Sequence, residues 1–206
     1  DSFLYAADGD SHEVSLVFDG RVILGTRARK ERSKSYNAFS SVDYPEAAVI
    51  RDGRLIRYLA CRHYEEGAVP AFYHRLEDRV LLLTLIPGMG AEGLRLLKDS
   101  YQALILQSFG VGGLPGGDSG PLAQAIGEWL EAGRTIVMMT QVPYEGSDMS
   151  VYQVGQQVKE KFQLIETYNM TLEAAAAKLM WVLGRTDRPE EIRDLFYRPV
   201  QHDLIR

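Results

Sequence analysis

The chain has 206 residues, enough for one large or two small domains, and its 46% apolar and 25% charged residues are typical of a folded protein that buries a core. Its formal net charge of −5 argues against nucleic acid as the main partner, because duplex-binding proteins usually present a basic face. No run of about 18 apolar residues occurs, so no membrane span is expected.

The first part of the chain predicts paired β-strands. Residues 13–18 and 21–24 are apolar runs on either side of an Asp-Gly turn, which is the signature of a β-hairpin, and residues 47–60 repeat the pattern. Residues 2–7 resemble the end of a helix, and there is no initiator methionine. We therefore expect the chain to be a fragment.

The basic run at residues 26–34, Thr-Arg-Ala-Arg-Lys-Glu-Arg-Ser-Lys, has three interpretations. It could be a solvated loop, it could contact nucleic acid, or one lysine could serve a polar site at the end of a strand. Composition alone does not choose among them.

The pattern changes after residue 62. Residues 63–76 contain Gly and Pro and have no apolar period, which predicts a linker between a first domain, residues 1–62, and a second domain, residues 77–206. In the second domain, apolar runs alternate with amphipathic helical patterns three times. Strands are predicted within 79–89, 103–110 and 135–143, and helices within 91–100, 121–133, 150–162, 171–184 and 188–197.

This βαβαβα order predicts an α/β fold with a parallel sheet covered by helices, of the flavodoxin-like kind. In the strongest helix, Thr171 is the expected N-cap, and Leu172, Ala176, Leu179 and Leu183 form the expected apolar stripe. Ligands of such folds bind beyond the carboxyl ends of the strands.

A glycine-rich loop at residues 107–121 follows the second of these strands. Gly112 and Gly117 have the first spacing of a phosphate-binding P-loop, but Asp118 stands where the phosphate-binding lysine is required. Gly110, Gly112 and Pro115 fail the dinucleotide fingerprint at its third glycine. We therefore expect no nucleotide there.

Other catalytic patterns are missing from the sequence. The four histidines have no metal-ligand spacing, no Gly-x-Ser-x-Gly motif occurs, and Cys61 is the only cysteine. We expect no metal, no cofactor and no internal disulfide, and a reducing compartment is compatible with this cysteine usage.

Five stretches together resemble the L-asparaginase family, in particular its type I, cytosolic branch. They occur in the family's order and cover nearly the whole chain: residues 16–30, 36–41, 103–115, 140–155 and 168–184. The resemblance implies the end of the N-terminal catalytic α/β domain followed by a flavodoxin-like C-terminal domain. It also implies a cytoplasmic enzyme that converts L-asparagine and water to L-aspartate and ammonia through a threonine acyl-enzyme.

The resemblance carries over one catalytic residue, Lys30, which matches the lysine that handles a proton with the family's threonine and aspartate. Arg27, Arg29, Arg32 and Lys34 receive no role from it and are expected to be solvated. The family's Thr-Gly-Gly-Thr and Thr-Asp-Thr motifs do not occur, so we expect this chain to be inactive alone. The alternatives are an asparaginase-like subunit of a glutamyl-tRNA amidotransferase and a non-catalytic flavodoxin-like binding module.

The resemblance also gives the glycine loop a role. In the family, this loop of one subunit reaches the rim of its neighbour's active site. The resemblance therefore implies that Gly110, Val111, Gly112 and Gly113 lie at such a rim, and that the protein is a homodimer or homotetramer. Gly113 replaces the family's usual asparagine. Gln107 and Val142 stand where some type I members use Arg and Cys to bind a second asparagine, so that allosteric site is not expected.

Overall fold

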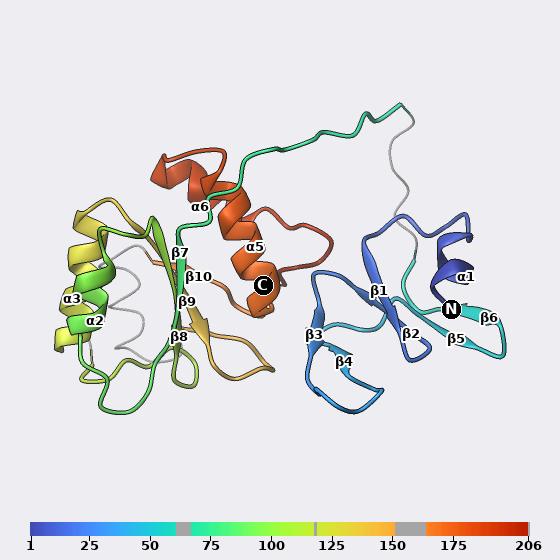
Figure 1. The fold of residues 1–206 in the computed structure, drawn as a ribbon, viewed down its shortest axis with the longest axis horizontal. Coiled ribbons are helices and arrows are strands. Elements are labelled where there is room, and N and C mark those ends of the chain that lie inside the picture. The colour runs from blue at the N-terminus through green and yellow to red at the C-terminus, as the bar shows by residue number, and fades with distance from the viewer. Residues whose placement is uncertain (61–66, 118, 151–163, 206) are drawn as a thin grey trace. The chain divides into compact units, whose positions relative to one another are not determined.

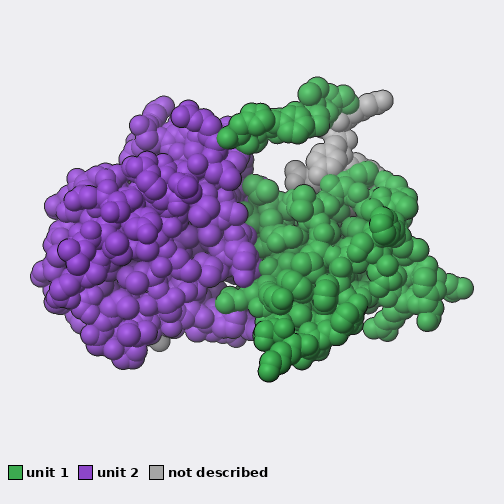
Figure 2. Space-filling view, in the orientation of Figure 1, with its two compact units in different colours: residues 1–74, 200–203 green, residues 75–199, 204–206 purple. Residues whose placement is uncertain are grey.

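The computed structural model describes residues 1–60, 67–117, 119–150 and 164–205 (Figure 1). The chain divides into two compact units, coloured separately in Figure 2. The first contains residues 1–74 and 200–203, and the second contains residues 75–199 and 204–206. The sequence predicts residues 200–203 in the second domain, whereas their tertiary contacts group them with the first unit.

The first unit is built on an antiparallel sheet in the order β1-β2-β5-β6, beside a separate ribbon of β3 and β4. Its elements are α1 (Ser2–Ala6), β1 (Ser15–Phe18), β2 (Arg21–Leu24), β3 (Ala28–Lys30), β4 (Phe39–Ser41), β5 (Ala48–Arg51) and β6 (Arg54–Arg57).

Both hairpins predicted from an Asp-Gly pair are present. Asp19 and Gly20 have φ values of 52° and 70°, and Asp52 and Gly53 have φ values of 50° and 69°. Positive φ at both central residues is the geometry of a type I′ turn, whose twist matches that of the flanking strands. The local sequence therefore determines the register of β1 with β2 and of β5 with β6.

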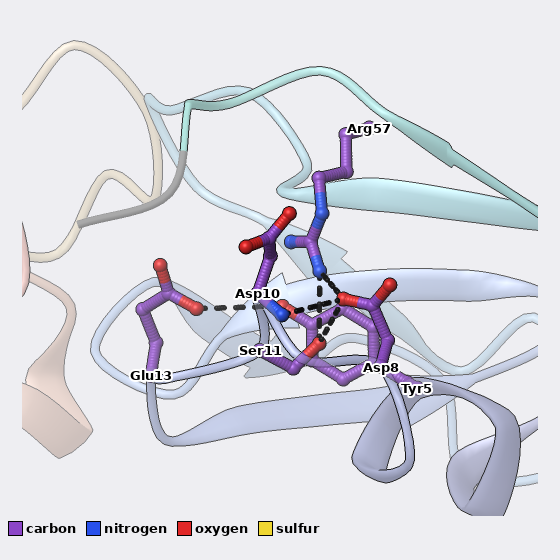
Figure 3. A network of polar contacts seen from close by, with 6 residues as sticks. All are labelled: Tyr5, Asp8, Asp10, Ser11, Glu13 and Arg57. Atoms are coloured by element: carbon purple, nitrogen blue, oxygen red, sulfur yellow. Dashed lines mark hydrogen bonds and ion pairs between the residues drawn. The ribbon is translucent and has the colours of Figure 1, made fainter. Parts of the chain in front are cut away.

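Helix α1 belongs to the first unit through a polar network around Asp8 (Figure 3). Arg57 of β6 forms an ion pair with the Asp8 carboxylate and donates a hydrogen bond of 3.0 Å to Ser11 Oγ. Its guanidinium also lies over the ring of Tyr5, 5.5 Å from the centroid. Burial raises the pKa of Asp8, but the hydrogen bonds from Arg57, Asp10 and Ser11 outweigh this and lower it overall. The network ties α1 to the sheet.

The second unit is a parallel sheet in the order β10-β9-β8-β7, with helices on both faces (Figure 1). This confirms the α/β prediction. The elements are β7 (Val80–Thr84), α2 (Glu92–Leu97), β8 (Ala103–Ser108), α3 (Pro121–Glu131), β9 (Thr135–Thr140), β10 (Ile165–Glu166), α5 (Leu172–Leu183) and α6 (Pro189–Tyr197). The helix expected at residues 150–162 lies outside the described residues, apart from Ser150.

Strand β8 is buried along its whole length because helices cover both of its faces. Leu104 and Leu106 pack with α2 and α3, and Ile105 packs with α5 and α6. Trp129 of α3 is fully buried and donates a hydrogen bond of 2.8 Å from Nε1 to the carbonyl oxygen of Leu94 in α2. The continuous apolar run in the sequence is therefore the centre of a three-layer core.

Helix α5 begins at the predicted cap, where Thr171 Oγ1 accepts a hydrogen bond of 3.1 Å from the backbone N–H of Ala174. Its buried side differs from the predicted stripe. Of the four predicted residues only Leu179 is fully buried, and the helix also buries Lys178. Lys178 is accommodated because its Nζ donates a hydrogen bond of 2.6 Å to the carbonyl oxygen of Arg198, after α6.

Candidate functional site

Lys30 is the last residue of β3 and is exposed. It pairs across the ribbon with Phe39 of β4, and its Nζ lies 5.7 Å from the centroid of the Phe39 ring. Phe39 packs edge-on against Phe18 of β1, with ring centroids 5.2 Å apart. A cation near an aromatic ring is attracted by the negative face of the ring, so Phe39 attracts the Lys30 side chain, which remains exposed to solvent.

The basic run around Lys30 is not uniformly solvated, which corrects one expectation from the sequence. Arg29 is half-buried, and Arg32 and Lys34 are exposed, but Arg27 is fully buried, with 0% of its surface accessible. Burial lowers the pKa of Arg27 from its ordinary value, while the nearby Asp203 and Asp43 carboxylates raise it.

In the second unit, β7, β8 and β9 end side by side at the same edge of the sheet. The edge is polar and ordered. Thr84 Oγ1 donates to Gln107 Oε1 at 2.7 Å, and Gln141 Nε2 donates to the carbonyl oxygens of Leu85 and Gln107 at 2.7 and 3.1 Å. These hydrogen bonds join the segments that leave the three strands.

The glycine loop begins at this edge, after the central strand β8, as predicted. It folds back on itself: the N–H of Gly113 donates a hydrogen bond of 2.8 Å to the carbonyl oxygen of Phe109. Gly110 and Gly112 have φ values of 49° and 143°, and a Cβ on Gly112 would lie 2.7 Å from Cγ of Met149. These glycines are needed for conformation and close approach, with no phosphate required to explain them.

Two further features bear on the chemistry. Among the residues with a described placement, no group of three or more His, Cys, Asp or Glu is arranged to bind a metal ion. A cavity of about 250 Å³ lies at the other edge of the sheet, near the first residues of β9, β10 and α6. Its charged lining mixes both signs: Arg134, Asp187, Glu190 and Arg193.

The chain therefore joins two domain types: a first unit in which strand β3 presents a lysine, and a second unit whose parallel sheet has a polar carboxyl edge. The family model of the asparaginase N-terminal domain matches residues 1–60, and that of the glutaminase/asparaginase C-terminal domain matches residues 79–196. The chain belongs to the asparaginase family.

Particular relatives agree with this assignment. The chain is 32% identical over 193 residues to an L-asparaginase of Thermococcus kodakarensis, covering 93% of this chain and 57% of the relative. It is 32% identical over 198 residues to a subunit of the glutamyl-tRNA(Gln) amidotransferase of the same organism, covering 91% and 43%. It is 28% identical over 201 residues to L-asparaginase 1 of Escherichia coli K12, covering 97% and 58%.

Solved structures show the same fold. The thermostable L-asparaginase from Thermococcus kodakarensis superposes with a TM-score of 0.88 at 29% identity, covering 98% of this chain and 60% of that one. L-asparaginase I from Vibrio cholerae superposes with a TM-score of 0.78 at 24% identity, a likeness of fold alone, covering 94% and 57%. The chain spans about half the length of the relatives it matches.

The described helices include none that is both long enough and apolar enough to cross a membrane.

Proposed function

We propose that this chain is the lysine-bearing part of an asparaginase-type amidohydrolase that converts L-asparagine and water to L-aspartate and ammonia. The observation that carries the proposal is the place of Lys30: it ends a strand in the unit matched by the N-terminal family model, and that unit is followed by the matched C-terminal domain. The similarity to named L-asparaginases supports the substrate.

In the proposed reaction a threonine hydroxyl attacks the side-chain amide carbon of asparagine. The Lys30 amine, beside an aspartate, takes the hydroxyl proton and passes it to the amide nitrogen, which leaves as ammonia as the ester bond to the threonine forms. Water then hydrolyses the resulting ester and releases aspartate and the free hydroxyl. Because residues 1–206 contain neither threonine motif of the family, we assign the threonines and the aspartate to segments outside them, and this chain alone is inactive.

The experiment joins residues 1–206 to the part of the Thermococcus kodakarensis L-asparaginase that this chain does not match. Ammonia release from asparagine is expected from the chimera and not from the 206-residue chain, each purified from a host lacking asparaginase. Lys30→Met in the chimera is expected to lower kcat by about a thousandfold or more, because a member of the catalytic unit is removed.

The matched control is Lys34→Met, which removes an exposed lysine four residues away and should leave kcat near that of the parent chimera. An active chimera that survives Lys30→Met would refute the assignment of Lys30. Turnover by the 206-residue chain near that of an intact family enzyme would show that the nucleophile lies within these residues.

The second candidate is an asparaginase-like subunit of a glutamyl-tRNA amidotransferase. It is favoured by the similarity to a subunit of the glutamyl-tRNA(Gln) amidotransferases of Thermococcus kodakarensis and Pyrococcus furiosus. Glutamine in place of asparagine as the preferred amide donor of the chimera would support it. An extra small β domain encoded upstream would support it independently.

The proposed parent protein is cytoplasmic and is a homodimer or homotetramer in which Gly110, Val111, Gly112 and Gly113 approach the neighbouring subunit's site. The three glycines, which have no side chain, and the tight turn support close approach between subunits. A fully active parent protein that remains monomeric in light scattering at micromolar concentration would contradict this arrangement.

A further inference from the structure

The ribbon that carries Lys30 is too small to be stable by itself. Strand β3 has three residues, its only partner among the described strands is β4, and Lys30 is its final residue. A two-stranded ribbon of this length is at best marginally stable in water, so its position depends on what anchors its two ends. Phe39 contacts Lys30 at one end. The other end begins next to Arg27.

Arg27 anchors that end through both its backbone and its side chain. Its carbonyl oxygen accepts a hydrogen bond of 3.0 Å from the N–H of Val42, just beyond β4. Its Nε donates a hydrogen bond of 2.5 Å to the carbonyl oxygen of His202. A fully buried guanidinium is tolerated only when it is hydrogen-bonded and near opposite charge, and the Asp43 and Asp203 carboxylates supply that charge.

The hydrogen bond from the Arg27 side chain is accepted within residues 200–203, a segment with an unusual backbone conformation. Gln201 and His202 have φ values of 46° and 59°, a left-handed conformation that is unfavourable for residues other than glycine. The Gln201 carbonyl oxygen accepts a hydrogen bond of 2.6 Å from Thr26 Oγ1, beside the Arg27–His202 bond. The strained turn is therefore held by hydrogen bonds from Thr26 and Arg27, the two residues that precede β3.

Hydrogen bonds within residues 200–203 and stacking on an aromatic ring also stabilise this turn. Asp203 is buried, its Oδ1 accepts from the N–H of Val200 at 2.8 Å, and its own N–H donates to the Val200 carbonyl oxygen at 3.0 Å. The His202 ring stacks on Tyr44 with centroids 4.9 Å apart, and the Arg27 guanidinium lies 5.4 Å from the same ring.

We propose that Arg27 and the 200–203 segment form a clasp that positions Lys30. This inference rests on the proposed function, which gives Lys30 its chemical task, and it makes Arg27 a positioning residue. Lys30 is three residue steps from Arg27, a distance of about 10 Å along an extended strand, so a shift at the clasp moves the lysine with the ribbon. Misplacement by about 1 Å is enough to lower a reaction rate by about a hundredfold.

The test measures how fast an amine-acylating reagent modifies Lys30 in the 206-residue chain, by mass spectrometry, relative to Lys98 in the second unit. Arg27→Met is expected to raise the Lys30 to Lys98 ratio by about two- to fivefold, because release of the ribbon removes the contact of the ammonium with Phe39. Arg27→Lys should restore part of the original ratio, since it keeps the charge without the guanidinium fork.

The matched control is Arg54→Met, the same substitution at an exposed residue of the first unit, and it should leave the ratio unchanged. If Arg27→Met does not fold, Thr26→Val decides the question, because it keeps the shape and removes the bond to Gln201. An unchanged ratio in a folded Arg27→Met, or in Thr26→Val when Arg27→Met is unfolded, overturns the proposal. The acylation ratio is measured without turnover, so the two proposals can fail separately. If Arg27→Met shifts the ratio but the chimera stays active with Lys30→Met, the proposed function is refuted and the clasp is not.

Discussion

Thr140 holds the glycine loop to the polar edge of the second unit, and its removal has a predictable cost. It is the last residue of β9 and is 5% exposed. Its Oγ1 donates a hydrogen bond of 2.5 Å to the carbonyl oxygen of Gly110 and accepts one of 3.0 Å from the N–H of Val142. Thr140→Val keeps the shape of the side chain and removes both bonds.

The substitution leaves one carbonyl group and one N–H group without these partners. Each buried polar group that loses its partner costs about 1–3 kcal/mol, and water reaches part of this edge, so we expect the free energy of unfolding to fall by about 2–4 kcal/mol. The matched control is Thr186→Val. Its Oγ1 also donates once, to Glu191 Oε2 at 2.7 Å, and accepts once, from the N–H of Arg188 at 3.2 Å. Both of those bonds are solvent-exposed, so the control should cost about 0.5 kcal/mol or less.

The assay is urea unfolding followed by tryptophan fluorescence. The two tryptophans of the chain, Trp129 and Trp181, both lie in the second unit, so the signal reports the unfolding of that unit alone. The midpoint should move and the m-value should not, since the surface exposed on unfolding is unchanged. Hydrogen exchange should also become faster in residues 109–113. A loss for Thr140→Val within about 0.5 kcal/mol of the control would refute the reasoning.

Three further outcomes are expected. Gly146→Ala should lower the free energy of unfolding in urea by about 3 kcal/mol or more, and Gly133→Ala by about 1 kcal/mol. The two glycines have similar φ values of 73° and 74°, but a Cβ at Gly146 would lie 2.6 Å from a backbone carbonyl oxygen, whereas a Cβ at Gly133 would have nothing within 4 Å. Equal costs would contradict this reasoning. Hydrogen bonds from Arg79 lower the pKa of Glu77 from 4.5 to about 2, so this ion pair stabilises the fold above pH 4.5 and the contribution is lost as the pH falls toward 2. The stability difference between the parent chain and Glu77→Gln should shrink over that interval in urea midpoints taken at successive pH values, and a difference independent of pH would count against it. Calorimetry should detect no binding of ATP, GTP or NAD to the loop at residues 107–117, and tight binding of any of them would overturn its assignment as a structural loop.

Local chemistry explains why much of the fold could be predicted from the sequence. Each Asp-Gly pair specifies a turn with positive φ at two successive residues, which only a few residue types adopt readily. The continuous apolar run of β8 requires cover on both faces, so alternating strands and helices lead to a parallel sheet with helices on each side. Because the glycine loop directly follows β8 in the chain, its place at the carboxyl edge of the sheet could be predicted from chain order alone.

Tertiary structure alone decided the environment of Lys30. Arg27 and Lys30 belong to one basic run, and no local pattern separates the buried cation from the exposed one. The difference arises because Arg27 meets a backbone carbonyl group 175 residues away in the sequence, and a carbonyl acceptor is present in every residue. The sequence therefore determined the two Asp-Gly turns and the strands that they join, whereas a long-range hydrogen bond to a backbone group, which has no side-chain signature, decided which cation of the basic run is buried.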